Sequence, residues 1–232
     1  MTITVFENVR LVDPASGRDG IGRLTVEDGR IAAIDSPETP EGARVINGQG
    51  AVLCPGLVDM RVALGEPGFE YRESVKSGAR AAVAGGITTM AVLPNTSPAI
   101  DNPALVHLLK VRGEETGMVS IHPYGALTRG CEGGDMAELG LLQDAGAVAF
   151  TDGTRAIADA KQMRNLLSSS RFLDSLVVQH PEDPPLAKGA CATASALAVR
   201  LGLPQVPVAA EPIMIARVLR LAVTMGALLP SA

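Results

Sequence analysis

The feature that most constrains the fold is the alternation, after Pro55, of short apolar runs with helical patterns. The apolar runs predict strands buried on both faces, over residues 57–62, 87–93, 119–124, 147–151 and 176–180. Helical patterns stand between and after them, over residues 71–84, 103–116, 136–144, 156–168, 190–201 and 211–225. This order indicates an α/β chain with a parallel β/α architecture. Five such units are too few to close a barrel of eight strands.

The beginning of the chain has a different pattern. Short segments of alternating apolar and polar residues lie on either side of Asp28-Gly29, a dipeptide typical of a β-hairpin turn. We therefore expect residues 1–54 to form a small β layer and residues 55–232 to form a partial β/α barrel.

Charge and cysteine content exclude several classes of partner. The net charge is −5 without a Lys/Arg tract, so neither nucleic acid nor an anionic membrane is expected as a partner. No apolar stretch is long enough to span a bilayer, and we do not expect Met1–Val5 to begin a signal peptide. Cys54, Cys131 and Cys191 are odd in number and widely spaced, which predicts neither a disulfide framework nor a paired metal site. A reducing cytoplasm fits this pattern.

Several motifs together resemble the dihydroorotase family of cyclic amidohydrolases. They are Pro94-Asn95-Thr96, Asp101-Asn102-Pro103, Arg200–Pro204 and Glu211–Arg217. The resemblance implies a TIM-type (β/α)8 barrel of the amidohydrolase type, here incomplete with about five β/α units, and the N-terminal part of a small β-sandwich. It covers nearly the whole chain, but only about the first half of a typical family member.

The first barrel strand departs from the family at the metal site. The resemblance implies that two histidines, one residue apart, hold zinc just after Asp59, and the two positions are Arg61 and Ala63 here. The family arginine that holds a substrate carboxylate is Gly65. An arginine side chain is permanently protonated and has no lone pair for a metal. We expect Arg61 to point inward and to pair with Asp152 or Asp59; the alternative is a surface arginine.

Other strand ends keep residues that match the family. Asp152 and His180 match two metal ligands, and we interpret them as vestigial, because catalytic zinc usually has three protein ligands. Asn95 matches a substrate-binding asparagine, although its amide could equally cap its own loop. His122 is a lone histidine in an apolar strand, which more often indicates a core residue than a ligand. We therefore predict no catalytic residue and no bound cofactor.

Three hypotheses follow for the function. The first is a dihydroorotase-like chain without catalysis that forms an oligomer with aspartate carbamoyltransferase, since some family members that lack metal ligands act as its structural partners in pyrimidine synthesis. The second is an active cyclic amidohydrolase in which Asp152, His180 and either His122 or Asp59 bind one metal ion. The third is that the chain is a fragment of a longer protein, whose missing strands would leave an open sheet edge.

Overall fold

The computed structural model describes residues 2–227, which divide into two compact units, Met1–Gly56 and Leu57–Ala232. None of the helices in the described part of the chain is both long and apolar enough to cross a membrane.

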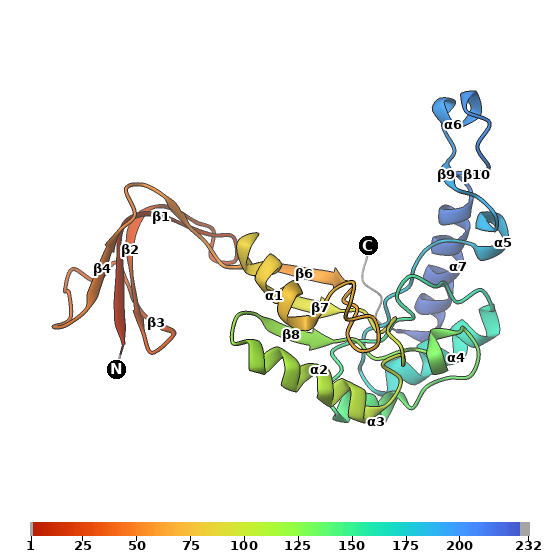
Figure 1. Ribbon diagram of the computed structural model, residues 1–232, viewed down its shortest axis with the longest axis horizontal. Helices are drawn as coiled ribbons and strands as arrows, with labels where there is room; N and C mark the ends of the chain where they lie inside the picture. Colours follow the sequence, from red (N-terminus) through yellow and green to blue (C-terminus); the bar gives the residue numbers. More distant parts are fainter. Residues whose placement is uncertain (1, 228–232) are drawn as a thin grey trace. The chain divides into compact units, whose positions relative to one another are not determined.

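The first unit is a single five-stranded sheet (Figure 1). Its strands are β1 (Ile3–Asp13), β2 (Arg18–Glu27), β3 (Arg30–Ile34), β4 (Arg44–Asn47) and β5 (Val52–Leu53). The strands β3, β2 and β1 are antiparallel neighbours, whereas β4 and β5 both run parallel to β1. Asp28 and Gly29 join β2 to β3 with positive φ angles of 45° and 78°, as a tight hairpin turn requires.

A parallel sheet forms the centre of the second unit. Three strands lie in the order β6 (Leu57–Val62), β7 (Ile87–Val92) and β8 (Ser120–Pro123). Two further chain segments continue this order through single parallel bridges, which pair Gly125 with Phe150 and Phe150 with Val177. The carboxyl ends of five parallel segments therefore come together on one side of the unit.

The expected strands over 147–151 and 176–180 are thus much shorter than predicted. The N–H of Thr151 still donates to the Gly125 carbonyl at 3.0 Å, but side chains accept the N–H groups of several residues around it. The N–H of Gly153 donates to Thr151 Oγ1, and those of Leu127 and Thr128 donate to Asp152 Oδ1. The Gly153 bond is local and competes with a sheet ladder, whereas the two Asp152 bonds join residues far apart in the sequence; regular pairing ends at these residues.

The five longest helices of the second unit accompany its strands (Figure 1). They are α1 (Val75–Ala84), α2 (Pro103–Thr116), α3 (Leu139–Asp144), α4 (Ala160–Phe172) and α7 (Ala210–Met225). Residues of α1, α2, α4 and α7 pack with β7, β8 and Phe150 into one apolar core. Two helices begin later than predicted because a capping side chain fixes their first turn: Ser74 forms a capping box before α1, and Asp159 accepts two backbone N–H groups before α4.

The helix predicted over residues 190–201 is wrong. The segment instead forms β9 (Ala192–Thr193) and the short α6 (Ala196–Arg200), and β10 (Gln205–Val206) then pairs with β9. The Ser195 side chain accepts the N–H of Ala198, which starts α6 only at residue 196. A short helix, α5 (Pro184–Ala187), precedes this segment.

Candidate functional site

Arg61 connects three strand ends in the second unit. Its backbone N–H donates to Asp59 Oδ1 at 3.0 Å, so the aspartate supports the end of β6. Its guanidinium Nη2 lies 3.4 Å from the carbonyl oxygen of Gly153 and 3.3 Å from Nδ1 of His180. The side chain therefore crosses the strand ends, as the inward orientation requires, while its residue remains exposed.

The partners of the Arg61 guanidinium differ from those expected. Among residues 2–227, no carboxylate oxygen lies within 4.0 Å of it, so the predicted ion pair with Asp152 or Asp59 is wrong. The Asp59 carboxylate is occupied by the backbone instead. The Gly153 carbonyl and the His180 imidazole contact the guanidinium instead of the expected carboxylate.

His180 is half-buried at the end of the fifth segment. Burial lowers the pKa of its imidazole, the Arg61 charge lowers it further, and Glu182 and Glu211 act in the opposite direction. A guanidinium can only donate, so Nδ1 of His180 must accept in its contact with Arg61. The neutral ring consequently has its proton on Nε2.

Asp152 is buried and serves a loop rather than the strand ends. Its Oδ1 accepts the N–H groups of Leu127 and Thr128, both at 2.9 Å, and its Oδ2 accepts the Thr128 hydroxyl in a short hydrogen bond. Thr128 Oγ1 also accepts the N–H of Gly133 at 2.8 Å, so the network holds residues 127–133. Burial raises the pKa of the carboxyl group, although these hydrogen bonds lower it in part. Both oxygens are therefore in use.

Asn95 joins the end of β7 to the segment that follows Asp152. Its Nδ2 donates to the Asp152 carbonyl at 2.8 Å, and its Oδ1 accepts the N–H of Thr154 at 3.3 Å. A Cβ atom on Gly153 would lie 1.3 Å from Asn95 Oδ1, so this contact requires glycine. The amide thus holds a neighbouring loop, and its predicted contact with substrate stays a prediction.

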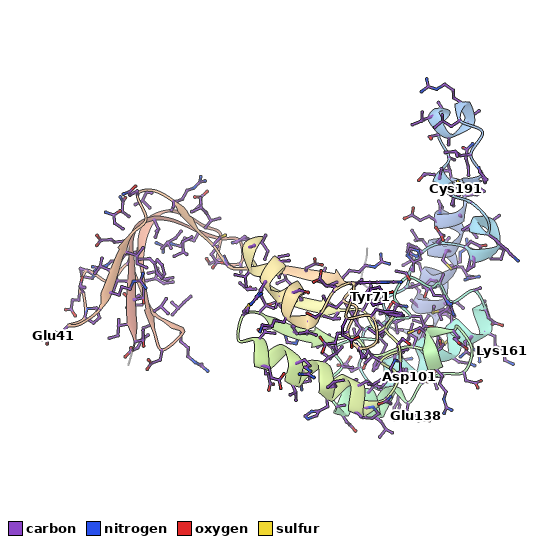
Figure 2. The ribbon with its side chains drawn as sticks, in the orientation of Figure 1. Glu41, Tyr71, Asp101, Glu138, Lys161 and Cys191 are labelled. Carbon is purple, nitrogen blue, oxygen red and sulfur yellow. The ribbon has the colours of Figure 1, made fainter. Side chains whose placement is uncertain are left out.

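Gly65 stands in a tight loop, at the position that matches the family arginine. Its N–H donates to the Glu73 carbonyl at 2.9 Å, and its own carbonyl accepts from Phe69 at 2.6 Å. A Cβ atom at residue 65 would lie 2.2 Å from the Phe69 carbonyl oxygen, so no side chain fits. Figure 2 labels Tyr71 on the same loop, where it is exposed.

The strand ends of the described residues do not bring three donors together for a divalent metal. Within residues 2–227, no group of three or more His, Cys, Asp and Glu side chains lies close enough to hold an ion. Asp152 turns its oxygens to Thr128, and His180 turns Nδ1 to Arg61. His122 is exposed on β8 and lines a surface pocket with residues of α2 such as Lys110.

Sequence reasoning missed the contacts that organise this region. Thr128 and Gly133 complete the Asp152 network, and Gly153 supplies the carbonyl that faces Arg61. Thr128 lies 24 residues before Asp152 in the sequence, and nothing local marks it as a partner. The sequence signal for a turn after Asp152 was Gly153 itself, because glycine permits the left-handed backbone conformation that the structure has there, with φ of 64°.

Comparison with known proteins gives the same family along most of the chain. The family model described as dihydro-orotase-like matches residues 50–229. A dihydroorotase of Syntrophus aciditrophicus (strain SB) is 40% identical over 222 residues, which are 95% of this chain and 52% of that protein. A dihydroorotase-like protein of Pseudomonas putida is 40% identical over 218 residues, which are 94% of this chain and 51% of the relative. The chain therefore spans about half the length of the curated relatives that it matches.

Solved structures agree on the fold. L-hydantoinase (dihydropyrimidinase) from Arthrobacter aurescens superposes with a TM-score of 0.81 at 24% identity, covering 99% of this chain and 52% of that one. D-hydantoinase (dihydropyrimidinase) from Thermus sp. gives 0.75 at 21% identity, with 97% and 51% covered. The predicted fold class, an incomplete TIM-type barrel with part of a β-sandwich, is confirmed.

Proposed function

The chain belongs to the dihydroorotase-like family of metal-dependent cyclic amidohydrolases, and from this premise we propose that it has no dihydroorotase activity and acts as a structural partner of aspartate carbamoyltransferase in pyrimidine synthesis. The observation on which the proposal rests is the Arg61 guanidinium, which stands at a family metal-ligand position and contacts His180, the residue that matches another ligand.

The chemistry of ring opening explains why this observation matters. Hydrolysis of a cyclic amide needs an activated water and a polarised carbonyl, and a bound metal ion supplies both in this family. The permanent charge of Arg61 repels a divalent cation, and the methyl group of Ala63 has no lone pair. Asp152 and His180 each have a coordinating atom engaged by another residue. Each of these four positions argues against an activated water.

A structural role needs a surface for the partner. The strand β6 pairs with β7 on one side only in the described part of the unit. Val58 and Met60 lie on it with 60% and 70% of their surface exposed. An edge strand with exposed apolar side chains favours association with another chain or with the remaining strands of a longer barrel, since the matched relatives are about twice as long as this chain. We propose that this surface contacts the transcarbamoylase in a hetero-oligomer in the cytoplasm.

Affinity copurification tests the partnership. The tagged chain, coexpressed with aspartate carbamoyltransferase, should retain it in a stable complex. A Val58→Lys, Met60→Lys variant should lose the complex, while Val199→Lys should keep it, because Val199 is similarly exposed but lies on α6. Absence of the transcarbamoylase from the purified wild-type sample would refute the partnership.

The alternative function is an active metal-dependent cyclic amidohydrolase. It is favoured by about 40% identity to proteins named dihydroorotase and by the presence of Asp152 and His180. We expect no zinc-dependent opening of dihydroorotate by the wild-type chain, before any histidine is restored at residues 61 and 63. Turnover that is lost with a chelator and regained with zinc would establish the alternative.

A further inference from the structure

The charge of Arg61 has no acidic partner within the described residues, which sets it apart from several other arginines of the chain. Arg10, Arg18 and Arg112 each form an ion pair with an Asp or Glu side chain. Among residues 2–227, the Arg61 guanidinium makes polar contacts through Nη2 alone, at 3.3 Å to an imidazole and 3.4 Å to a backbone carbonyl, although a guanidinium has five N–H donors. Residue 61 is exposed in the described part of the chain, which leaves the remaining donors without a described partner.

His180 adds a second donor to the same place. Its Nδ1 accepts in the contact with Arg61, so the proton of the neutral ring is on Nε2. No hydrogen bond to Nε2 is present among residues 2–227. An acceptor group that meets the free edge of the guanidinium could therefore also meet this N–H.

No acidic side chain of the described residues forms an ion pair with the Arg61 guanidinium. Asp59 accepts the backbone N–H of Arg61, and Asp152 is buried against Thr128. Glu182 and Glu211 influence His180, but neither lies within 4.0 Å of an arginine, lysine or histidine nitrogen of the described chain. The carboxyl ends of the strands thus offer two convergent donors where the family fold usually places its ligands.

We propose that Arg61 and His180 form a binding site for a small molecule with a carboxylate group. The planar fork of a guanidinium matches the two oxygens of a carboxylate, and Nε2–H of His180 supplies a third hydrogen bond from a different direction. Ala63 and Gly153 add no bulky or acidic side chain at the ends of their segments. This inference does not depend on the absence of catalysis, since it concerns binding alone.

Calorimetric titration of the full chain with malonate, at constant ionic strength, tests the site. We expect saturable binding that weakens about tenfold or more in Arg61→Gln, because a charged hydrogen-bonding partner is lost. Arg61→Lys keeps the charge but not the fork, and it should also bind more weakly than the wild type. Arg30→Gln removes the same charge from the exposed strand β3 and should leave the affinity unchanged.

Two variants of His180 separate the roles of its nitrogen atoms. The amide nitrogen of glutamine reaches the position of Nε2, whereas that of asparagine reaches only the position of Nδ1. His180→Gln should therefore retain more of the malonate affinity than His180→Asn does. Circular dichroism establishes that each variant is folded.

Three results would overturn the proposal. The first is the absence of saturable malonate binding by the wild-type chain. The second is an equal loss of affinity in Arg61→Gln and Arg30→Gln, which would indicate a general effect of charge. The third is binding of inorganic phosphate as tight as that of malonate, which would indicate a site for any anion instead of one that selects a carboxylate.

Discussion

Two strand ends in the barrel unit differ in what their side chains do. At the end of β6, Arg61 is exposed and makes two long contacts, while Ala63 is a methyl group. At the end of the fourth segment, Asp152 is buried and accepts three hydrogen bonds. The Asp152 side chain holds a loop in place, whereas the Arg61 side chain makes only two long contacts that contribute little to the stability of the fold.

The difference shows how a barrel of this kind can keep its fold while its site changes. Removing a buried acceptor leaves several donors unpaired, so substitutions there cost stability. Exposed charged contacts contribute little to stability, so a substitution at Arg61 changes the chemistry alone. Family motifs such as Pro94-Asn95-Thr96 fit this view, because Asn95 bonds to the backbone on both sides of Gly153.

The largest effect is expected for Asp152→Ala. The substitution removes the buried acceptor of the Thr128 N–H and hydroxyl and leaves the Leu127 N–H only the Thr151 carbonyl at 3.3 Å, which should lower the free energy of unfolding by about 3 kcal/mol or more. Urea unfolding followed by circular dichroism measures it. Asp152→Asn is the control, because one amide oxygen can still accept both N–H groups. A loss below about 1 kcal/mol would remove the distinction between the two strand ends.

Gly65→Ala should have the next largest effect. The added Cβ atom would approach the Phe69 carbonyl oxygen to 2.2 Å, so the loop must move, at a cost of about 2 kcal/mol. Gly134→Ala is a matched control, since nothing lies within 4 Å of a Cβ atom there. If thermal unfolding gave equal stability for the two variants, the loop would have room for the family arginine.

Arg61→Ala should change the free energy of unfolding by no more than about 0.5 kcal/mol, in contrast to Asp152→Ala. The guanidinium is exposed and its contacts of 3.3 Å and 3.4 Å are long. The same urea experiment measures this variant. A loss as large as that of Asp152→Ala would mean that Arg61 holds the strand ends together.

The last prediction concerns the chemical reactivity of the three cysteines and involves no change in the stability of the chain. Burial, with the nearby Asp152 and Asp101 charges, raises the pKa of the Cys131 thiol to about 12. The thiol therefore stays protonated as the pH rises through the neutral and mildly alkaline range, and iodoacetamide should not modify it in the native chain. Cys54 and Cys191 are exposed and should react. Intact mass should show two modified cysteines before unfolding and three after it; three in the native chain would contradict the burial of residue 131.

The sequence allowed much of the fold to be predicted, because local signals define many elements. Asn102 with Pro103 starts α2 and Gly117 ends it, within the limits that the pattern indicates. The extent of the segment 147–151 was harder to predict, since the Asp152 side chain next to it accepts the backbone N–H groups of Leu127 and Thr128, which are distant in the sequence. The helix over 190–201 failed for a local reason, the cap at Ser195.

The candidate site was predictable only in part. The position and charge of Arg61 follow from the sequence, but its contacts with Gly153 and His180 depend on how three strand ends meet. Asp152 matches a family position, yet its direction is decided by Thr128, in a loop far away along the chain. Predicting such contacts needs the loop conformations, which motif spacing does not contain.

Zinc binding by the purified chain tests the central claim most directly. After dialysis against zinc and then against buffer, inductively coupled plasma mass spectrometry should find no more zinc per chain in the wild type than in a His180→Ala variant. The reason is that Arg61 opposes a cation and Asp152 has both oxygens engaged. One zinc ion per wild-type chain, lost in the His180→Ala variant, would contradict the account.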